Sequence, residues 1–294
     1  MLITWEKVGR FLAEPFPGWT SVFILIASIS LAITGATLAT SPPNNSSVAA
    51  SPASDASIPH AGNVKAESSP AAPAPNLPPA TPPQPSQVLS PTPEQKINLP
   101  TENGLAPVIT KLPISEPVVF LGIDDGWTQT AEIQDWLSSH HLPFTLFLTD
   151  DAIKNNYGYY QGFQSHGMTI EDHTLHHPRL DRLDLAGQQA EICQTADKYA
   201  QIFGSRPTLL RPPYGAYNDL TRHVAAACGI KAIIMWDVVI DNGQIGYVKG
   251  LDHLEPGDIV LMHFKSYFVK DAELFMSEVQ KNNLQIGKLE DWLK

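Results

Sequence analysis

The C-terminal part of the sequence predicts an α/β domain built on parallel strands. Two observations lead to this prediction. Short apolar runs alternate with amphipathic stretches from residue 113 to residue 294. Polar motifs with carboxylates and imidazoles follow five of the runs, where the reactive groups of parallel α/β folds gather. The alternation alone allows either an open sheet or a barrel.

The expected strands are short and mostly apolar. Residues 117–123 form a run that suits a strand buried on both faces. Further strands are expected at residues 143–148, 168–171, 208–210, 230–235 and 258–262.

The expected helices lie between these strands. Thr128 is expected to cap a helix in which Ile133, Trp136 and Leu137 share one face. Further helices are expected near residues 151–165, 185–203, 217–228 and 270–282.

The amino-terminal part is expected to be a membrane anchor. Residues 19–39 are uncharged and mostly apolar, and a membrane-spanning helix needs about 20 such residues. Lys7 and Arg10 precede this stretch and the next basic residue is Lys65, so residues 1–18 should stay in the cytoplasm. A cleaved signal peptide is the alternative, although its apolar region is usually shorter. The domain would be held in the periplasm or at the cell surface by an anchor, and would be secreted after cleavage.

Residues 40–112 are expected to form a disordered linker. Sixteen of the 26 prolines fall within residues 41–110, together with many alanines and serines and only six charged residues. Such a segment cannot bury enough apolar surface to offset the entropy of ordering it. It would act as a fairly extended spacer between the membrane and the domain at residues 113–294.

Charge and cysteine content limit the possible ligands. The net charge is −11 and lies almost entirely in the C-terminal domain, which argues against nucleic acid or an anionic membrane as the ligand. Cys193 and Cys228 are the only cysteines, and each is expected in a helix. They could pair in an exported protein, but we expect two buried free thiols.

Five short motifs carry the candidate chemistry. They are Asp124-Asp125-Gly126, His173-Thr174-Leu175-His176-His177-Pro178, Arg211-Pro212-Pro213-Tyr214-Gly215, Trp236-Asp237 and Leu261-Met262-His263. His173 and His177 are four residues apart, so on one helical turn their imidazoles face the same way. Two imidazoles and a carboxylate suit zinc or another divalent metal, and a polar surface turn is the alternative.

Each remaining motif also has a structural interpretation. Asp-Asp-Gly is common as a turn or a helix N-cap, although adjacent carboxylates repel each other unless a cation relieves them. The run that begins at Arg211 could be only a rigid loop, and His263 could be a core histidine. A non-haem iron oxygenase would use the same donor set, but such enzymes more often have a β-sandwich fold. The ordered set favours a metal-assisted hydrolase.

In this order and spacing the motifs resemble those of polysaccharide deacetylases of carbohydrate esterase family 4, the NodB-homology domain, over residues 115–294. The resemblance implies a distorted (β/α) barrel with about seven parallel strands. It implies hydrolysis of N-acetyl groups from N-acetylglucosamine-type residues of a cell-envelope or extracellular polysaccharide. A divalent metal is implied as cofactor: zinc in the first place, with cobalt or another divalent ion as alternatives.

The resemblance also assigns roles to the acidic end of the site. It implies that Asp125, His173 and His177 are the metal ligands. It implies that Asp124 is the general base and that Arg211 orients Asp124.

The remaining roles come from the later motifs. The resemblance implies that His263 protonates the leaving amine and that the backbone N–H of Tyr214 holds the oxyanion. Trp236 and Leu261 would line the pocket for the acetyl methyl group, and we count Pro212 with these substrate-binding residues.

The sequence departs from the family pattern in three places. The first motif usually reads Thr-Phe-Asp-Asp-Gly-Pro; here Gly122 replaces the threonine and Trp127 replaces the proline, which is expected to change how the sugar sits. In the fourth motif, Val239 replaces the aspartate that supports the catalytic histidine. Residues 242–255 replace what is usually a short connection, so the substrate groove is expected to differ.

The fourth motif leaves two alternatives open. Asp237 or Asp241 takes over the support of His263, or His263 lacks a carboxylate partner. Because an unsupported histidine still titrates near neutral pH, we expect altered or weakened activity rather than none. The alternative function is an inactive relative that only binds glycan.

Overall fold

The computed structural model describes residues 88–99, 103–248 and 250–294. The expected anchor at residues 19–39 and most of the expected linker lie outside these ranges. Within these ranges, no helix is long and apolar enough to cross a membrane.

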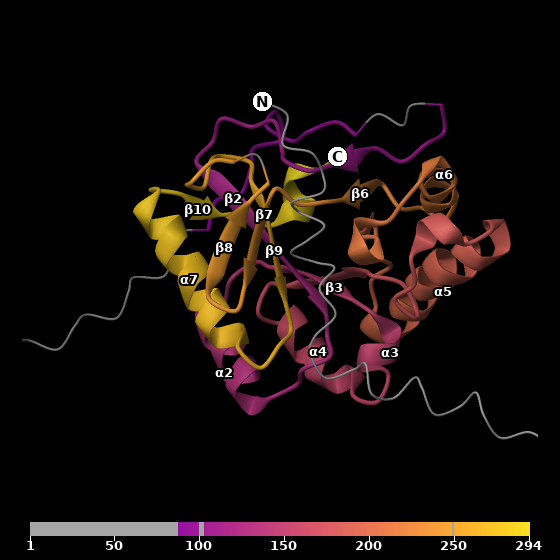
Figure 1. Ribbon diagram of the computed structural model, residues 1–294, viewed down its shortest axis with the longest axis horizontal. Helices are drawn as coiled ribbons and strands as arrows, with labels where there is room; N and C mark the ends of the chain where they lie inside the picture. The colour runs from indigo at the N-terminus through magenta and orange to yellow at the C-terminus, as the bar shows by residue number, and fades with distance from the viewer. Residues whose placement is uncertain (1–87, 100–102, 249) are drawn as a thin grey trace, which may run out of the picture. The chain divides into compact units, whose positions relative to one another are not determined.

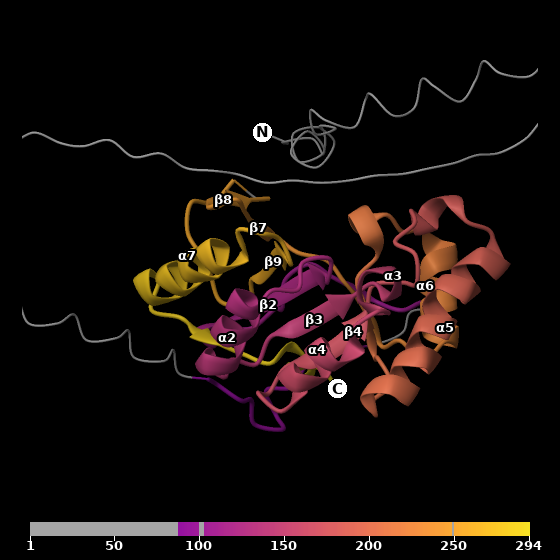
Figure 2. The same ribbon diagram turned by 90° about the horizontal axis from the view of Figure 1, so that it is seen from below.

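One curled, mostly parallel sheet forms the framework of the domain (Figures 1 and 2). Its order is β1-β6-β5-β4-β3-β2-β9-β7-β8, and β10 also pairs with β2. Among the named strands of the described residues, β7 and β8 form the antiparallel pair and the other pairs are parallel. The strands are Val108–Ile109 (β1), Val118–Asp125 (β2), Thr145–Leu148 (β3), Thr169–Asp172 (β4), Leu209–Leu210 (β5), Ala232–Ile234 (β6), Val238–Asp241 (β7), Gln244–Tyr247 (β8), Ile259–His263 (β9) and Gln285–Ile286 (β10). The predicted distorted barrel is therefore a half-barrel whose strand order starts at β1 and ends at β8.

Helices flank the sheet in two groups. α5 packs on α6 at one end of the sheet, and α2 packs on α7 toward the other (Figure 2). The helices are Ala131–His140 (α2), Asp150–Ile153 (α3), Tyr157–Gln164 (α4), Leu185–Phe203 (α5), Asp219–Ala227 (α6) and Phe268–Lys281 (α7). The single helix expected near residues 151–165 is thus two helices. The cap of α2 is Thr130 instead of Thr128, and its hydroxyl accepts the N–H of Ile133 at 3.3 Å.

The strand β2 is buried on both faces, as its apolar sequence predicts. Leu121 and Ile123 face a cluster that includes side chains of α2, α4 and α7. Phe120 faces the other way and packs edge-on against Trp292, with a centroid distance of 5.9 Å. Burial on both faces fixes the strand firmly, and the two acidic residues that end it are held in place as a result.

The domain begins earlier than residue 113. β1 pairs in parallel with β6, and Leu89 and Ile97 pack against the cluster around Trp292. Leu112 is 1% exposed. Part of the segment that was expected to be disordered is therefore folded, because a few apolar residues between the prolines find places on the domain.

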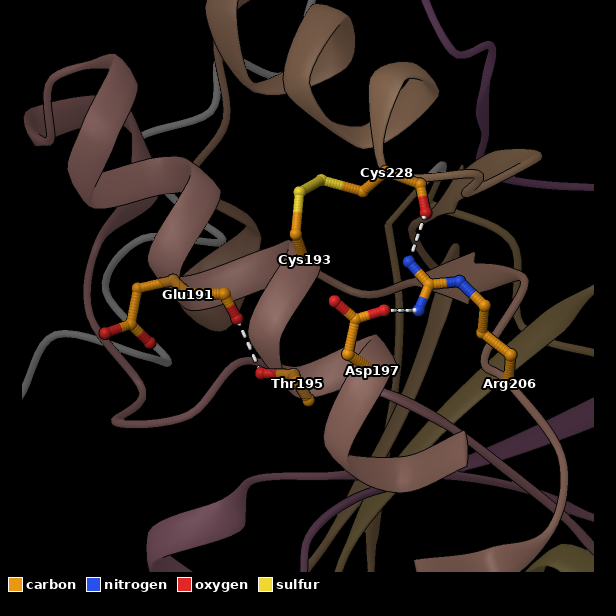
Figure 3. The surroundings of a disulfide bond; sticks show 6 residues. All are labelled: Glu191, Cys193, Thr195, Asp197, Arg206 and Cys228. Atoms are coloured by element: carbon orange, nitrogen blue, oxygen red, sulfur yellow. Dashed lines mark hydrogen bonds and ion pairs between the residues drawn. A yellow bond between two sulfur atoms is a disulfide. The ribbon is translucent and has the colours of Figure 1, made fainter. Parts of the chain in front are cut away.

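A disulfide joins Cys193 in α5 to Cys228 at the C-cap of α6 (Figure 3). The expectation of two free thiols is wrong. The two residues are 35 positions apart in the chain, but the packing of α5 against α6 brings their Cα atoms to 5.0 Å. Arg206 adds a second link beside it, since its guanidinium bonds both Asp197 and the carbonyl of Cys228.

The hairpin of β7 and β8 fills the first part of the unusual stretch at residues 242–255. Its two-residue turn is Asn242-Gly243, with φ values of 52° and 72°. Asn-Gly is typical of two-residue hairpin turns, so the sequence itself carries a local signal for this hairpin.

Candidate metal and catalytic site

The structure brings the sequence motifs together at the carboxyl ends of the strands. Asp124 and Asp125 end β2, His173 directly follows β4, and Arg211 directly follows β5. His263 ends β9, where it is the register partner of Asp124. Chemistry-bearing groups from four strands therefore meet at one edge of the sheet.

Asp125, His173 and His177 present three donor atoms to one point. The Oδ1 atom of Asp125 lies 3.4 Å from Nε2 of His173 and 3.2 Å from Nε2 of His177. All three donor atoms lie within 4.8 Å of one another. This oxygen is buried, yet it forms no well-directed hydrogen bond with any described residue. Two imidazole nitrogens and one carboxylate oxygen suit zinc or a similar divalent ion, so the residues present fit a metal.

The two histidines converge through an irregular loop, and the expected helical turn is wrong. Asp125, Thr174 and His177 all have left-handed backbones, with φ values of 75°, 72° and 59°. Non-glycine residues adopt this conformation only where surrounding contacts hold it. One such contact is the hydroxyl of Thr174, which accepts the N–H of His177 at 3.0 Å.

A second set of contacts orients these donors. Nδ1 of His173 donates to the carbonyl of Arg211 at 2.6 Å, which leaves Nε2 to face Asp125. Glu191 on α5 holds the loop between the histidines. Its Oε2 accepts the N–H groups of Leu175 and His176, both at 3.0 Å, and its Oε1 lies 2.7 Å from Nδ1 of His176.

Glu191 was missed from the sequence because nothing in the motif points to it. Its only signal is that a glutamate shares a helix face with several apolar residues. In the structure Glu191 is 8% exposed, and Ile192, Ala196 and Tyr199 of the same helix are fully buried. A buried acid needs partners, and here the partners are the N–H groups of the loop.

The charges around the donors shift their pKa values in opposite directions. Burial alone would raise the pKa of Asp125, but the rings of His173 and His177 hold it well below its usual value. Burial alone would lower the pKa of His173, whereas Asp124 and Asp125 raise it. The site therefore favours an ionised Asp125 and attracts positive charge.

Asp124 is fixed by a buried arginine. Nη1 of Arg211 donates to Oδ1 of Asp124 at 2.7 Å, and the guanidinium lies 4.2 Å from the ring centroid of Phe147. A Cβ atom at Gly122 would collide with this guanidinium. The absence of a side chain at Gly122, where the family usually has threonine, leaves the space that this guanidinium occupies here.

His263 lacks the support that the family pattern provides. Its Nδ1 is buried, and no described residue forms a hydrogen bond with it. Burial lowers the pKa of His263, although the carboxylates of Asp125 and Asp124 act against this. Val239, at the usual position of the supporting acid, pairs with Leu261 on β9.

The two acids near Val239 are engaged elsewhere. Oδ1 of Asp241 accepts from Nζ of Lys265 and from the hydroxyl of Tyr267, both at 2.9 Å. Oδ1 of Asp237 accepts the N–H of Ile259 at 3.0 Å. Burial and the neighbouring Asp258 raise the pKa of Asp237 to about 7. The sequence left two alternatives for the support of His263. In the structure, no carboxylate of the described residues forms a hydrogen bond with Nδ1 of His263.

The expected substrate-binding residues also lie at this edge. Pro212, Trp236 and Leu261 are buried, and Leu261 pairs with Gly122 of β2. Tyr214 is 57% exposed and has a left-handed backbone, and its ring packs edge-on against His177 with a centroid distance of 4.7 Å. Tyr214 thus contacts one of the candidate metal donors, while the other three are buried next to the same edge of the sheet.

Comparison with known proteins places this chain among the polysaccharide deacetylases. The family model for polysaccharide deacetylase matches residues 111–233. An uncharacterized protein of Streptomyces coelicolor is 36% identical over 194 residues, which cover 64% of this chain and 78% of the relative. The peptidoglycan-N-acetylmuramic acid deacetylase of Bacillus subtilis is 26% identical, over 50% of this chain and 60% of the relative. Other relatives are named as peptidoglycan-N-acetylglucosamine and chitin deacetylases.

The fold agrees with solved structures of the same class. A carbohydrate esterase family 4 pseudoenzyme from Bacillus anthracis superposes with a TM-score of 0.56 at 18% identity, over 65% of this chain and 71% of that one. The range matched by the family model contains Asp125, the two histidine donors and Arg211, but it ends before Trp236.

Proposed function

This chain belongs to the polysaccharide deacetylase family, and from this membership we propose that it is a metal-dependent hydrolase of envelope or extracellular polysaccharide. It would remove N-acetyl groups from N-acetylglucosamine-type residues. The observation that carries the proposal is the convergence of Asp125, His173 and His177 beside the ion pair of Asp124 with Arg211.

The proposed reaction has two stages, the attack of water on the acetyl carbonyl and the cleavage of the C–N bond. A divalent ion held by Asp125, His173 and His177 would polarise the acetyl carbonyl and lower the pKa of a bound water. Asp124 takes the proton from the attacking water. Arg211 occupies Oδ1 of Asp124, which leaves Oδ2 for this proton.

The second stage leads to cleavage of the C–N bond. As water oxygen bonds to the carbonyl carbon, the N–H of Tyr214 donates to the developing oxyanion. The C–N bond then breaks, acetate forms, and His263 gives its proton to the leaving amine. His263 is the register partner of Asp124 on the neighbouring strand, which supports a role for both in one reaction. Without a carboxylate partner, His263 is expected to be a less effective proton donor than the supported histidine of the family pattern.

The proposed setting is outside the cytoplasm. The apolar stretch at residues 19–39 would anchor the chain, and the following proline-rich residues would let the domain reach its polymer. The disulfide of Cys193 with Cys228 supports this proposal, because structural disulfides persist mainly in oxidising compartments.

Acetate release tests the proposal. The full chain would be supplied with zinc or cobalt and incubated with peptidoglycan and with N-acetylglucosamine oligomers, beside the Asp124→Asn variant. We expect metal-dependent acetate from the parent and none from the variant. The responding substrate would identify the polymer.

A glycan-binding relative without catalysis is the second candidate. The buried Nδ1 of His263, unpartnered in the described part of the chain, is the observation that favours it. Metal binding and glycan binding without acetate from any substrate would support this second function.

A further inference from the structure

The large exposed aromatic residue Trp127 has no place in the reaction described above. Its side chain is 56% exposed, whereas the other three tryptophans that the structure describes, Trp136, Trp236 and Trp292, are 8%, 9% and 0% exposed. Trp127 belongs to none of the apolar clusters of the described residues. A single exposed aromatic residue is not unusual in itself, so a function for Trp127 is inferred from its position in the fold.

The loop that carries Trp127 is rigid at both ends. On one side, the carbonyl of Gly126 accepts the hydroxyl of the buried Tyr160 at 2.6 Å, and a Cβ at Gly126 would come within 2.6 Å of Ile153. On the other side, Thr130 caps α2 and its carbonyl accepts the hydroxyl of Tyr159 at 2.9 Å. The exposed ring is therefore presented by a backbone that is fixed in advance.

The position of the ring relates it to the donors. Trp127 is two residues beyond Asp125, after the carboxyl end of β2. The other large exposed aromatic of this edge is Tyr214, which follows β5 and packs on His177. The strand order places β3 and β4 between β2 and β5. Trp127 and Tyr214 therefore follow strands at the same edge of the sheet as the three donors, Trp127 after β2 and Tyr214 after β5.

We propose that the indole of Trp127 stacks on the apolar face of a sugar ring linked to the ring whose acetyl group is hydrolysed. The site then takes an oligomer of N-acetylhexosamine in preference to a single sugar. Pyranose rings expose a face of C–H groups that an aromatic ring covers well, and their hydroxyls remain in water. A rigid platform lowers the entropy lost on binding. This inference rests on the proposed function for the identity of the substrate.

Binding measured by calorimetry tests this inference. The full chain with Asp124→Asn, which prevents turnover, would be titrated with the N-acetylglucosamine tetramer and with the monosaccharide. Adding Trp127→Ala is expected to weaken tetramer binding about tenfold, which corresponds to about 1.4 kcal/mol, while Trp127→Phe retains most of the affinity. Val88→Ala is the matched control. Val88 is 48% exposed and bridges to Ile286, beside the opposite end of β2.

The outcomes separate this inference from the proposed function. Equal tetramer affinity with and without the indole would overturn the stacking role, and so would a parent that binds the tetramer no better than the monosaccharide. Acetate release by the unsubstituted chain is measured in parallel. Indole-dependent binding without acetate would leave the stacking site standing and remove the hydrolase. Acetate release with tetramer affinity unaffected by Trp127→Ala would do the reverse.

Discussion

The two sides of the site differ in how their polar groups are held. On the β4–β5 side, His173 donates to a carbonyl, Arg211 bonds Asp124, and Glu191 accepts two N–H groups of the histidine loop. On the β7–β9 side, Nδ1 of His263 is buried without a hydrogen-bond partner in the described part of the chain. Asp241 instead accepts hydrogen bonds from Lys265 and Tyr267. The groups on the β4–β5 side are thus held by several buried hydrogen bonds, whereas the Nδ1 atom of His263 on the β7–β9 side is held by none from the described residues.

This difference separates two requirements of the proposed reaction. The donor atoms of a metal site must be held in a precise geometry. In this chain, buried contacts from α5 and from the loop after β5 hold them. Delivery of a proton tolerates a looser histidine, although the rate and the pH dependence then change. The disulfide of Cys193 with Cys228 lies on the β4–β5 side, because it joins the two helices that follow the loops of β4 and β5.

The largest effect is expected from removal of a candidate metal donor. Asp125→Ala should abolish metal binding and acetate release together, because the carboxylate is the only anionic ligand of the three. Asp124→Asn is the matched variant, which should keep the metal and lose turnover by about 10²–10⁴-fold, the usual range for a general base. Metal content by mass spectrometry and acetate release distinguish them. A fully active Asp124→Asn enzyme would refute the assignment of the base.

A smaller loss of metal affinity is expected when the outer support is weakened. Glu191→Ala removes the acceptor for two N–H groups of the histidine loop, and such outer contacts are typically worth about 10–100-fold in metal affinity. Competition with a chromophoric chelator measures it. Glu273→Gln, on the exposed face of α7, is the control. Unchanged affinity in Glu191→Ala would mean that backbone strain in the loop is held by other contacts.

Restoring an acid on the β7–β9 side should shift the pH profile of catalysis. Val239 pairs with Leu261, and side chains two residues apart on a strand share a face, so an aspartate at 239 would lie on the same side as His263. Val239→Asp should raise the lowered pKa of His263 and extend activity to higher pH, with a rate gain of about tenfold at most. Val239→Asn controls for shape without charge. Identical profiles for the two variants would argue that His263 does not supply the proton.

The smallest effect concerns stability on the same side. Burial and Asp258 raise the pKa of Asp237 to about 7, so the folded protein binds a proton that the unfolded chain has released. Unfolding free energy should therefore decrease as pH rises from about 4 to 7, and remain level above that. Asp237→Asn should remove this slope, which amounts to a few kcal/mol at most because one unit of pKa shift corresponds to about 1.4 kcal/mol. Urea unfolding across this pH range measures it, with the exposed Asp219→Asn as control. A slope that persists in Asp237→Asn would contradict the assignment.

Local signals in the sequence predicted the elements that depend on local contacts. The helix expected at residues 185–203 has those bounds in the structure, since Asp184 caps its start and Gly204 ends it in a left-handed conformation. The strand β2 was also predicted, because both its faces are buried and its residues are apolar throughout.

Features that depend on contacts distant in the chain were not predictable. The disulfide arises from the packing of two helices, and the folded part of residues 88–112 depends on the surface offered by the cluster around Trp292. In the site, the ordered motifs indicated which side chains would meet. They did not indicate that Glu191 would hold the loop or that Asp241 would bond Lys265, because neither partner lies in a motif.

Metal dependence tests the central claim most directly. The full chain would be stripped with a chelator and titrated with zinc or cobalt while acetate release from N-acetylglucosamine oligomers is followed. We predict no activity in the stripped protein, and recovery that is complete at one equivalent of metal and absent in Asp125→Ala. Full acetate release from protein that retains no metal would contradict the assignment of Asp125, His173 and His177 as the metal site of a deacetylase.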